Sequence, residues 1–250
     1  MRTSIPMAAA LAVTWLTGCA IQPLESLTAS GTPTVATAMV GDAGDSELNQ
    51  PNLVFAQFQG LELDTQTASG KDARMLDHPA ARMIAQLGRE TMDIMTDAER
   101  NAEDRSAYFR TLLADNLDIR GIGRFVLGKH WRRTSKPDRD TYMAVFSEFI
   151  VTVFARQLGS AQIDAFTVIA ARNGPKKDIL VKSLIMRQGK PYNIIWRMRP
   201  KGERYMVIDL AVEGISMAMT RRQEFNSIIR ANGGKIDGLT QKLRSFTTTS

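Results

Sequence analysis

The chain has 250 residues, of which 44% are hydrophobic and 23% are charged. This is ordinary globular composition, and it excludes a collagen-like or wholly disordered protein. A single cysteine, Cys19, excludes an intramolecular disulfide framework and a cysteine-based structural zinc site, and the two histidines leave little material for a His-rich metal centre. The net charge of +6 would suit nucleic acid, an anionic membrane or an acidic partner.

The first residues resemble a bacterial lipoprotein signal. Arg2 precedes a mostly apolar run that ends at Leu16, and this run is shorter than the roughly 20 residues that span a bilayer. A short apolar run behind a basic residue is typical of a secretory signal peptide. Residues 16–19 resemble the lipobox, in which cleavage before the cysteine leaves a thiol that carries a diacylglyceryl group. We therefore expect residues 1–18 to be a lipoprotein signal peptide and Cys19 to be the lipid anchor; ordinary signal cleavage with an incidental cysteine is the alternative.

The signal also predicts the compartment. Ala20 follows the cysteine, and the lack of an aspartate at this position resembles the pattern of lipoproteins sent to the outer membrane. We expect a periplasmic protein that is lipid-anchored to the outer membrane. Export removes nucleic acid as the natural partner of the basic charge, and no RRM, helix-turn-helix or zinc-finger pattern is present in the sequence.

Residues 19–76 differ in composition from the rest of the chain. They are rich in Thr, Ala, Gly, Ser and Gln, and seven acidic residues stand against two basic ones between positions 20 and 74. This composition predicts a flexible acidic tether. An apolar run at residues 53–58 is the exception, and it would either dock on the domain or form a short strand. Residues 77–250 carry 29 basic and 19 acidic side chains, so a domain with a net charge of about +10 follows the acidic tether.

The domain opens with helical periodicity. Apolar spacings of three and four predict helices within residues 83–95, 108–117, 137–158, 217–230 and 238–243. The third of these is the clearest, because Pro137 and Asp138 are start signals and Gly159 is a stop signal.

Between the third and fourth of these helices the apolar period changes to two. Strands are predicted around residues 166–170, 179–185, 192–198 and 205–211. The turns between them are rich in Gly and Pro and are too short for crossover helices, so the strands should form an antiparallel meander. The predicted fold class is α+β, with helices covering one face of an antiparallel four-stranded sheet.

No catalytic motif is present in the sequence. It lacks GxxxxGK[ST], GxSxG and HExxH, and the glycines at residues 121–126 lack the third Gly or Ala of a dinucleotide fingerprint. Asp209, at an inward strand position, is either a catalytic carboxylate or, as we prefer, one satisfied by backbone groups or an arginine. His130 is better interpreted as a packing or surface histidine than as a base. We therefore expect a protein that is not an enzyme and that uses neither a cofactor nor a metal.

Two blocks of the sequence resemble the MlaC-type, or toluene-tolerance, family of periplasmic phospholipid-binding proteins. Residues 117–132 are similar to that family's helix and LGxxWR turn. Residues 205–239 are similar to its W-x-V-x-D-x-x-x-E-G-[VI]-S junction and C-terminal GxxGLxxxL helix, although Tyr205 replaces the usual Trp. The resemblance covers residues 77–244, with a sheet of the right size between the blocks. The lipobox and the long tether depart from the family's usual soluble carrier.

The resemblance implies a lipid carrier that shuttles phospholipid between the outer and inner membranes. Its implied partners are the phospholipid cargo, an inner-membrane ABC transporter complex and an outer-membrane lipoprotein–porin complex. The acyl chains would lie in an apolar cavity where residues of the third helix face residues of the strands. The expected lining consists of Phe146, Phe149, Ile150 and Val153 from the helix and Val168, Val181, Ile185, Ile194, Trp196, Met198 and Val207 from the strands.

A basic run would meet the phosphate head groups or an acidic partner surface. Its members are Arg124, Lys129, Arg132, Arg133, Lys136 and Arg139. A plain packed core and a solvated basic face are the alternatives to a lipid site. Two other functions are compatible with the sequence: a small periplasmic hydrolase that uses the same cavity, and an accessory module of an envelope complex that binds no lipid.

Overall fold

The computed structural model describes residues 75–159 and 161–248. The chain divides into two units, and all of the described residues belong to the unit that spans Asn52–Ser250. The predicted signal peptide, Cys19 and the tether up to residue 74 lie outside the described residues. Almost all of the described residues lie within 77–250, the range predicted for the basic domain; the division of the chain into signal peptide, tether and domain stays a prediction.

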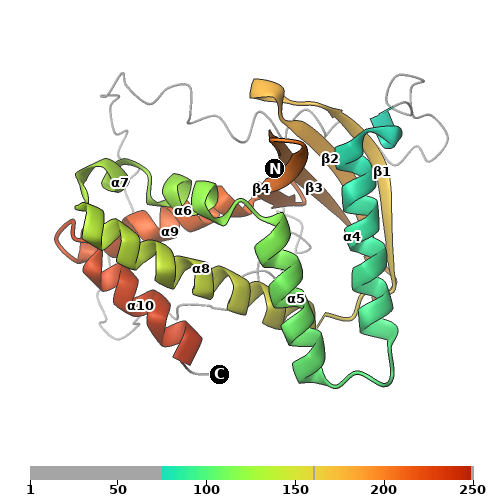
Figure 1. Cartoon of the computed structure of the whole chain (residues 1–250), viewed down its shortest axis with the longest axis horizontal. Helices are drawn as coiled ribbons and strands as arrows, with labels where there is room; N and C mark the ends of the chain where they lie inside the picture. Colours follow the sequence, from blue (N-terminus) through green and yellow to red (C-terminus); the bar gives the residue numbers. More distant parts are fainter. Residues whose placement is uncertain (1–74, 160, 249–250) are drawn as a thin grey trace, which may run out of the picture. The chain divides into compact units, whose positions relative to one another are not determined.

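Seven α-helices are found in the described part of the chain (Figure 1). They are α4 (Pro79–Thr96), α5 (Ala102–Asn116), α6 (Ile119–Leu127), α7 (Lys129–Arg133), α8 (Lys136–Gly159), α9 (Met217–Ala231) and α10 (Asp237–Thr248), and the 3-10 turn η1 (Met75–Asp77) precedes α4. Capping side chains start several of them, because Asn101, Asp118 and Ser216 accept hydrogen bonds from the first free amides of α5, α6 and α9. The predicted helices are confirmed, with small changes at their ends.

The strands form one antiparallel sheet in sequence order. They are β1 (Ala165–Asn173), β2 (Ile179–Arg187), β3 (Lys190–Lys201), β4 (Arg204–Val212) and β5 (Ile215–Ser216), and the 3-10 turn η2 (Pro175–Lys177) connects β1 to β2. The α+β class and the antiparallel meander are confirmed. The sheet has five strands rather than four, because β5 is only two residues long and shows no alternating pattern in the sequence.

Tight turns explain why the strands follow one another as a meander. Gln188 and Gly189 both have positive φ, at 50° and 71°, and so do Glu213 and Gly214, at 47° and 80°. Two central residues of this kind define the type I′ turn, whose twist matches that of an antiparallel hairpin. Each such turn joins neighbouring strands in the fewest possible residues.

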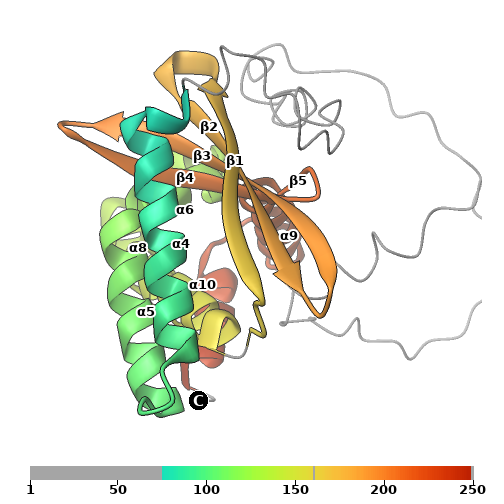
Figure 2. The ribbon, with the colours of Figure 1, turned by 90° about the vertical axis from the view of Figure 1, so that its right-hand side faces the viewer.

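Helix α4 packs on one face of the sheet (Figure 2). Ala80, Ala81 and Ile84 are buried there against strand residues that include Val181 and Met198. Small residues allow this close approach: a Cβ atom at Gly88 would lie 2.1 Å from a ring carbon of Phe166. The sheet and α4 therefore share one apolar cluster, which we call the sheet cluster.

The remaining long helices form a second apolar cluster around α8. This helix packs against α5, α6 and α10, and α9 packs against α6 and α10 (Figure 1). The buried side chains between α6, α8, α9 and α10 include Tyr142, Phe146, Phe225 and Leu239. We call this group the helical cluster. A smaller group around Phe109 joins α5 to α4 and α8.

The corner between α5 and α6 ties the helices to the sheet. The amide of Asp118 donates a hydrogen bond of 2.9 Å to the carbonyl oxygen of Val207 in β4, and Leu117 forms a parallel bridge with the same residue. The Asp118 carboxylate also lies 3.0 Å from the ammonium of Lys201. The Leu117 side chain packs against the sheet cluster, the helical cluster and the group around Phe109. One leucine thus contacts three separate apolar groups.

We expect Leu117→Ala to lower the free energy of unfolding by about 2–4 kcal/mol, because the lost methyl groups leave a gap where three clusters meet. Leu112→Ala is the matched control, because Leu112 lies on α5 and is half-buried like Leu117 but belongs to none of the three apolar groups; it should cost less than about 1 kcal/mol. Urea unfolding followed by circular dichroism measures both. An equal decrease in the free energy of unfolding for the two variants would show that the contacts of Leu117 at this corner add no extra stability.

Candidate functional site

The strand residues expected to line a cavity lie on the face of the sheet that α4 covers. Val181, Met198 and Val207 are buried in the sheet cluster. Val168 and Trp196 pack at its edge. Ile194 is buried and Ile185 is half-buried, and strand pairing places both on this face: Ile194 opposite Ser183, and Ile185 opposite Tyr192 and Phe166.

The helix residues expected to face them lie elsewhere. Phe146, Phe149, Ile150 and Val153 are all buried in the helical cluster, against α6, α9 and α10 rather than against the strands. Aromatic contacts hold them there: the Phe225 ring lies 6.2 Å from the Phe146 ring. The expectation that these α8 residues lie over the strand residues is therefore wrong. The apolar face of α8 was identified correctly, but α9 and α10 cover it.

Part of the sheet face is apolar and yet incompletely buried. Phe166, Val168, Ile185 and Trp196 are all half-buried, whereas core side chains such as Phe109 are fully buried. The Phe166 and Trp196 rings lie 6.3 Å apart in an edge-on arrangement. The indole Nε1 of Trp196 donates a 2.9 Å hydrogen bond to the hydroxyl of Ser183, so its one polar atom is satisfied within the sheet. We call these four side chains the apolar wall.

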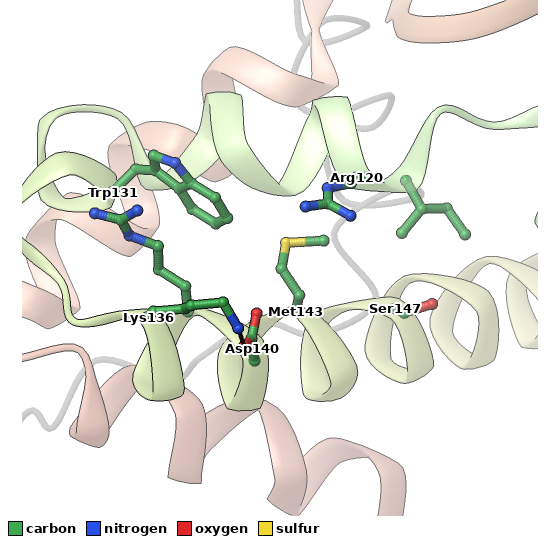
Figure 3. Close-up of a pocket in the computed structure, with 8 residues that line it drawn as sticks. Arg120, Trp131, Lys136, Asp140, Met143 and Ser147 are labelled. Carbon is green, nitrogen blue, oxygen red and sulfur yellow. Dashed lines mark hydrogen bonds and ion pairs between the residues drawn. The ribbon is translucent and has the colours of Figure 1, made fainter.

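A pocket of about 550 Å³ lies between α6, α7 and α8 (Figure 3). Its lining residues are Ile119, Arg120, Trp131, Lys136, Arg139, Asp140, Met143 and Ser147. Figure 3 shows Trp131 and Arg120 on one side and Lys136, Asp140, Met143 and Ser147 along α8 on the other. The pocket therefore combines an apolar floor with a rim of charges.

Of the basic residues expected at head groups, Lys136 and Arg139 line this pocket, and the other four lie around it. Arg124 stacks on the Trp131 ring at 6.0 Å, and Lys129, Arg132 and Arg133 are exposed on α7. Their contact with head groups stays a prediction. The pocket takes its cations from α6, through Arg120, and from α8. Sequence reasoning missed Arg120, although it lies one helical turn before Arg124 and the spacing of four residues places both on one side of α6.

Asp209 is fully engaged in hydrogen bonds. One of its oxygens accepts from the amides of Leu210 (2.8 Å) and Ala218 (3.0 Å), and the other accepts from the Ser216 hydroxyl (2.6 Å). Burial raises the pKa of Asp209, and these donors oppose that shift. The preferred interpretation of Asp209, a carboxylate satisfied by its neighbours, is confirmed: it joins β4 and β5 to the start of α9.

His130 is a buried ring on α7, as the packing interpretation predicted. Burial lowers its pKa, and the nearby charges of Lys129 and Arg133 lower it further, so the ring is neutral at pH 7. Among the described residues, no group of three His, Cys, Asp or Glu side chains could hold a metal ion. None of the described helices has both the length and the hydrophobicity that a membrane span needs.

Comparison with known proteins gives a family match and a structural neighbour. Residues 85–245 match the model of a family described as MlaC protein. A solved structure that the chain resembles is that of a phospholipid-binding protein from Ralstonia solanacearum in complex with a phospholipid. The TM-score is 0.56 at 17% sequence identity, and the match covers 67% of this chain and 96% of that chain. At this identity the likeness establishes a shared fold.

We expect Asp209→Ala to lower the free energy of unfolding by about 3 kcal/mol, because the Ser216 hydroxyl and the Ala218 amide would be buried without their acceptor. Asp115→Ala removes the same charge from an exposed position on α5 and should change stability by less than about 0.5 kcal/mol. Guanidinium titration measures both. A stable Asp209→Ala protein would mean that the carboxylate is kept for a purpose other than this junction.

Proposed function

The chain belongs to the MlaC family, as its two sequence blocks predicted, and we propose from this premise that it binds phospholipid by the acyl chains and carries it across the periplasm. The proposal is one of binding and not of catalysis. Asp209 is occupied by three donors, and His130 is buried beside two cations. Bound phospholipid is cargo under this proposal, and no cofactor is required.

The observation that carries the proposal is the apolar wall. Each methylene removed from water gains roughly 0.8 kcal/mol, so a lipid leaves a bilayer only for a protein that offers its chains comparable apolar cover. Phe166, Val168, Ile185 and Trp196 are large apolar side chains that the fold leaves half-buried. Further burial against an acyl chain would remove their remaining apolar surface from water. Trp196 adds no unpaired polar atom to such a wall.

The correction to the lining residues changes where we place the acyl chains. Val181, Met198 and Val207 form the closed base of the sheet cluster, beneath α4. The half-buried wall lies on the same face of the sheet. We therefore assign the lipid chains to the apolar wall, on the same face of the sheet as α4. We assign Phe146, Phe149, Ile150 and Val153 to the packed core of the helices.

The place of the protein in the envelope rests on residues outside the described range. We propose that Cys19 is lipidated, that it anchors the chain to the outer membrane, and that the acidic tether lets the basic domain reach lipid donors and acceptors. The proposed partners are an inner-membrane ABC transporter complex and an outer-membrane lipoprotein–porin complex. The surplus of basic side chains after residue 76 favours approach to anionic lipid surfaces.

The apolar wall is tested by Val168→Glu, with Thr167→Glu as the matched control. The two residues are neighbours on β1, but Val168 belongs to the wall whereas Thr167 is exposed on the opposite face. A carboxylate against acyl chains costs several kcal/mol, so Val168→Glu should lose its copurified phospholipid while Thr167→Glu keeps it.

Phospholipid per mole of protein and circular dichroism are measured on the same preparations. Retention of phospholipid by a folded Val168→Glu variant would contradict the assignment of the wall. Equal loss by both variants would show that added charge, and not the wall, decides lipid binding.

The anchor is tested by Cys19→Ser, which removes the sulfur that would carry the diacylglyceryl group. We expect the variant to leave the membrane fraction, because it would lack the diacylglyceryl group and with it the acyl chains of the anchor. Stable anchoring needs more than one such chain. Fractionation and mass spectrometry of the mature N-terminus follow the change. A wild-type protein that is wholly soluble, with an N-terminus other than residue 19, would contradict the proposed lipid anchor.

A further inference from the structure

We propose that the pocket between α6, α7 and α8 binds a phosphate monoester carried on an apolar chain, with Arg139 and Arg120 as the phosphate ligands and Trp131 and Met143 as the apolar floor. This site shares no residue with the apolar wall, so the proposal goes beyond phospholipid binding by the sheet. Figure 3 shows Arg120, Trp131 and Met143 together, and Arg139 is a further lining residue of the same pocket.

The size and floor of the pocket suit a small amphiphile. Its volume of about 550 Å³ lies within the range of roughly 300–1,000 Å³ that is usual for small-molecule sites. Ile119, Trp131 and Met143 line it and pack against the helical cluster behind, yet all three are only half-buried. Apolar surface is therefore available to a ligand, and a methionine adapts readily to its shape.

The charges in the pocket favour an anion. Three cations, Arg120, Lys136 and Arg139, stand against the single carboxylate of Asp140, which leaves a surplus of two positive charges. Asp140 pairs with Lys136 at 2.9 Å, but both side chains are more than half exposed, so this pair is weak. Arg120 makes no hydrogen bond or ion pair within the described residues. A monoester with up to two negative charges would balance the surplus.

Arg139 is held in place and has an unmet hydrogen-bond donor. Its guanidinium stacks on the Trp131 ring at 5.3 Å and donates a 3.3 Å hydrogen bond to the carbonyl oxygen of Arg132. Its Nε is buried and has no acceptor among the described residues. A buried donor without a partner is unfavourable, so a small rotation toward a ligand oxygen would be favoured. Arginine also matches phosphate geometry with two parallel hydrogen bonds.

Two arginines contact the Trp131 ring. Arg124 contacts the ring at 6.0 Å and Arg139 contacts it at 5.3 Å. These cation–π contacts restrain the indole, so the floor of the pocket is formed before a ligand arrives. The same contacts make Trp131 emission sensitive to any movement of Arg139, which supplies a local readout of binding.

The test uses hexyl phosphate, with inorganic phosphate and hexanol as the separated parts of the probe. The full chain in a nonionic detergent is titrated by calorimetry and by tryptophan fluorescence. We expect hexyl phosphate to bind and to change the emission, and we expect this change to disappear in Trp131→Phe. Each separated part should bind at least about tenfold more weakly.

Arg139→Gln and Arg120→Gln should each weaken hexyl phosphate by about tenfold, because each removes a charge-assisted hydrogen bond. Arg120 is exposed, so its variant should fold even if loss of the Trp131 stack harms Arg139→Gln. Arg89→Gln, which removes an exposed charge on α4 outside the pocket, is the matched control and should leave affinity unchanged.

Three results would overturn the proposal. Equal weakening by Arg89→Gln would mean that diffuse charge attracts the probe. Inorganic phosphate that binds as well as hexyl phosphate would make this a site for free phosphate. Loss of hexyl phosphate binding in Val168→Glu, with no effect of Arg120→Gln, would place the probe at the apolar wall; that result would leave the function proposed for the wall intact.

Discussion

The contact between Leu117 and Val207 is the constraint on which the rest of the fold depends. A backbone hydrogen bond ties the start of α6 to β4, and the leucine side chain enters three apolar groups at that point. The sheet with α4 and the helices around α8 can therefore each keep an apolar cluster of their own. The apolar side of α8 is covered by α9 and α10 and does not cover the sheet. Part of the sheet face is therefore left half-buried beside a packed helical core.

Most of the secondary structure could be predicted because its causes are local. Alternating apolar residues give the strands, and glycines at positive φ, such as Gly189 and Gly214, give the turns between them. The role of Asp209 could also be anticipated, since an inward carboxylate without a catalytic motif needs donors nearby. The strand β5 could not, because two residues carry no period, and its pairing depends on the turn at Glu213 and Gly214.

The candidate site shows where sequence reasoning ends. Periodicity identified the apolar face of α8 through Phe149 and Val153, but it cannot say which element covers that face. In the structure, α9 and α10 cover it. The charged run after Arg124 was noticed for the same local reason. Which of its members share a pocket depends on how α6, α7 and α8 pack, and that packing selects Arg120 and Arg139 and leaves Arg133 in solvent. The sequence shows directly which residues are basic or apolar, whereas the tertiary packing decides which of them become neighbours.

The central claim is that the half-buried sheet face is a place for phospholipid and not an imperfectly packed core. The most direct measurement is organic extraction of the unmodified full chain, purified from its own envelope in a detergent free of phosphorus, followed by phosphorus analysis and mass spectrometry of the extract. The expected result is phospholipid in a fixed stoichiometry with the protein, whatever the detergent used. Phospholipid no higher than in an unrelated lipoprotein purified in the same way would contradict the claim.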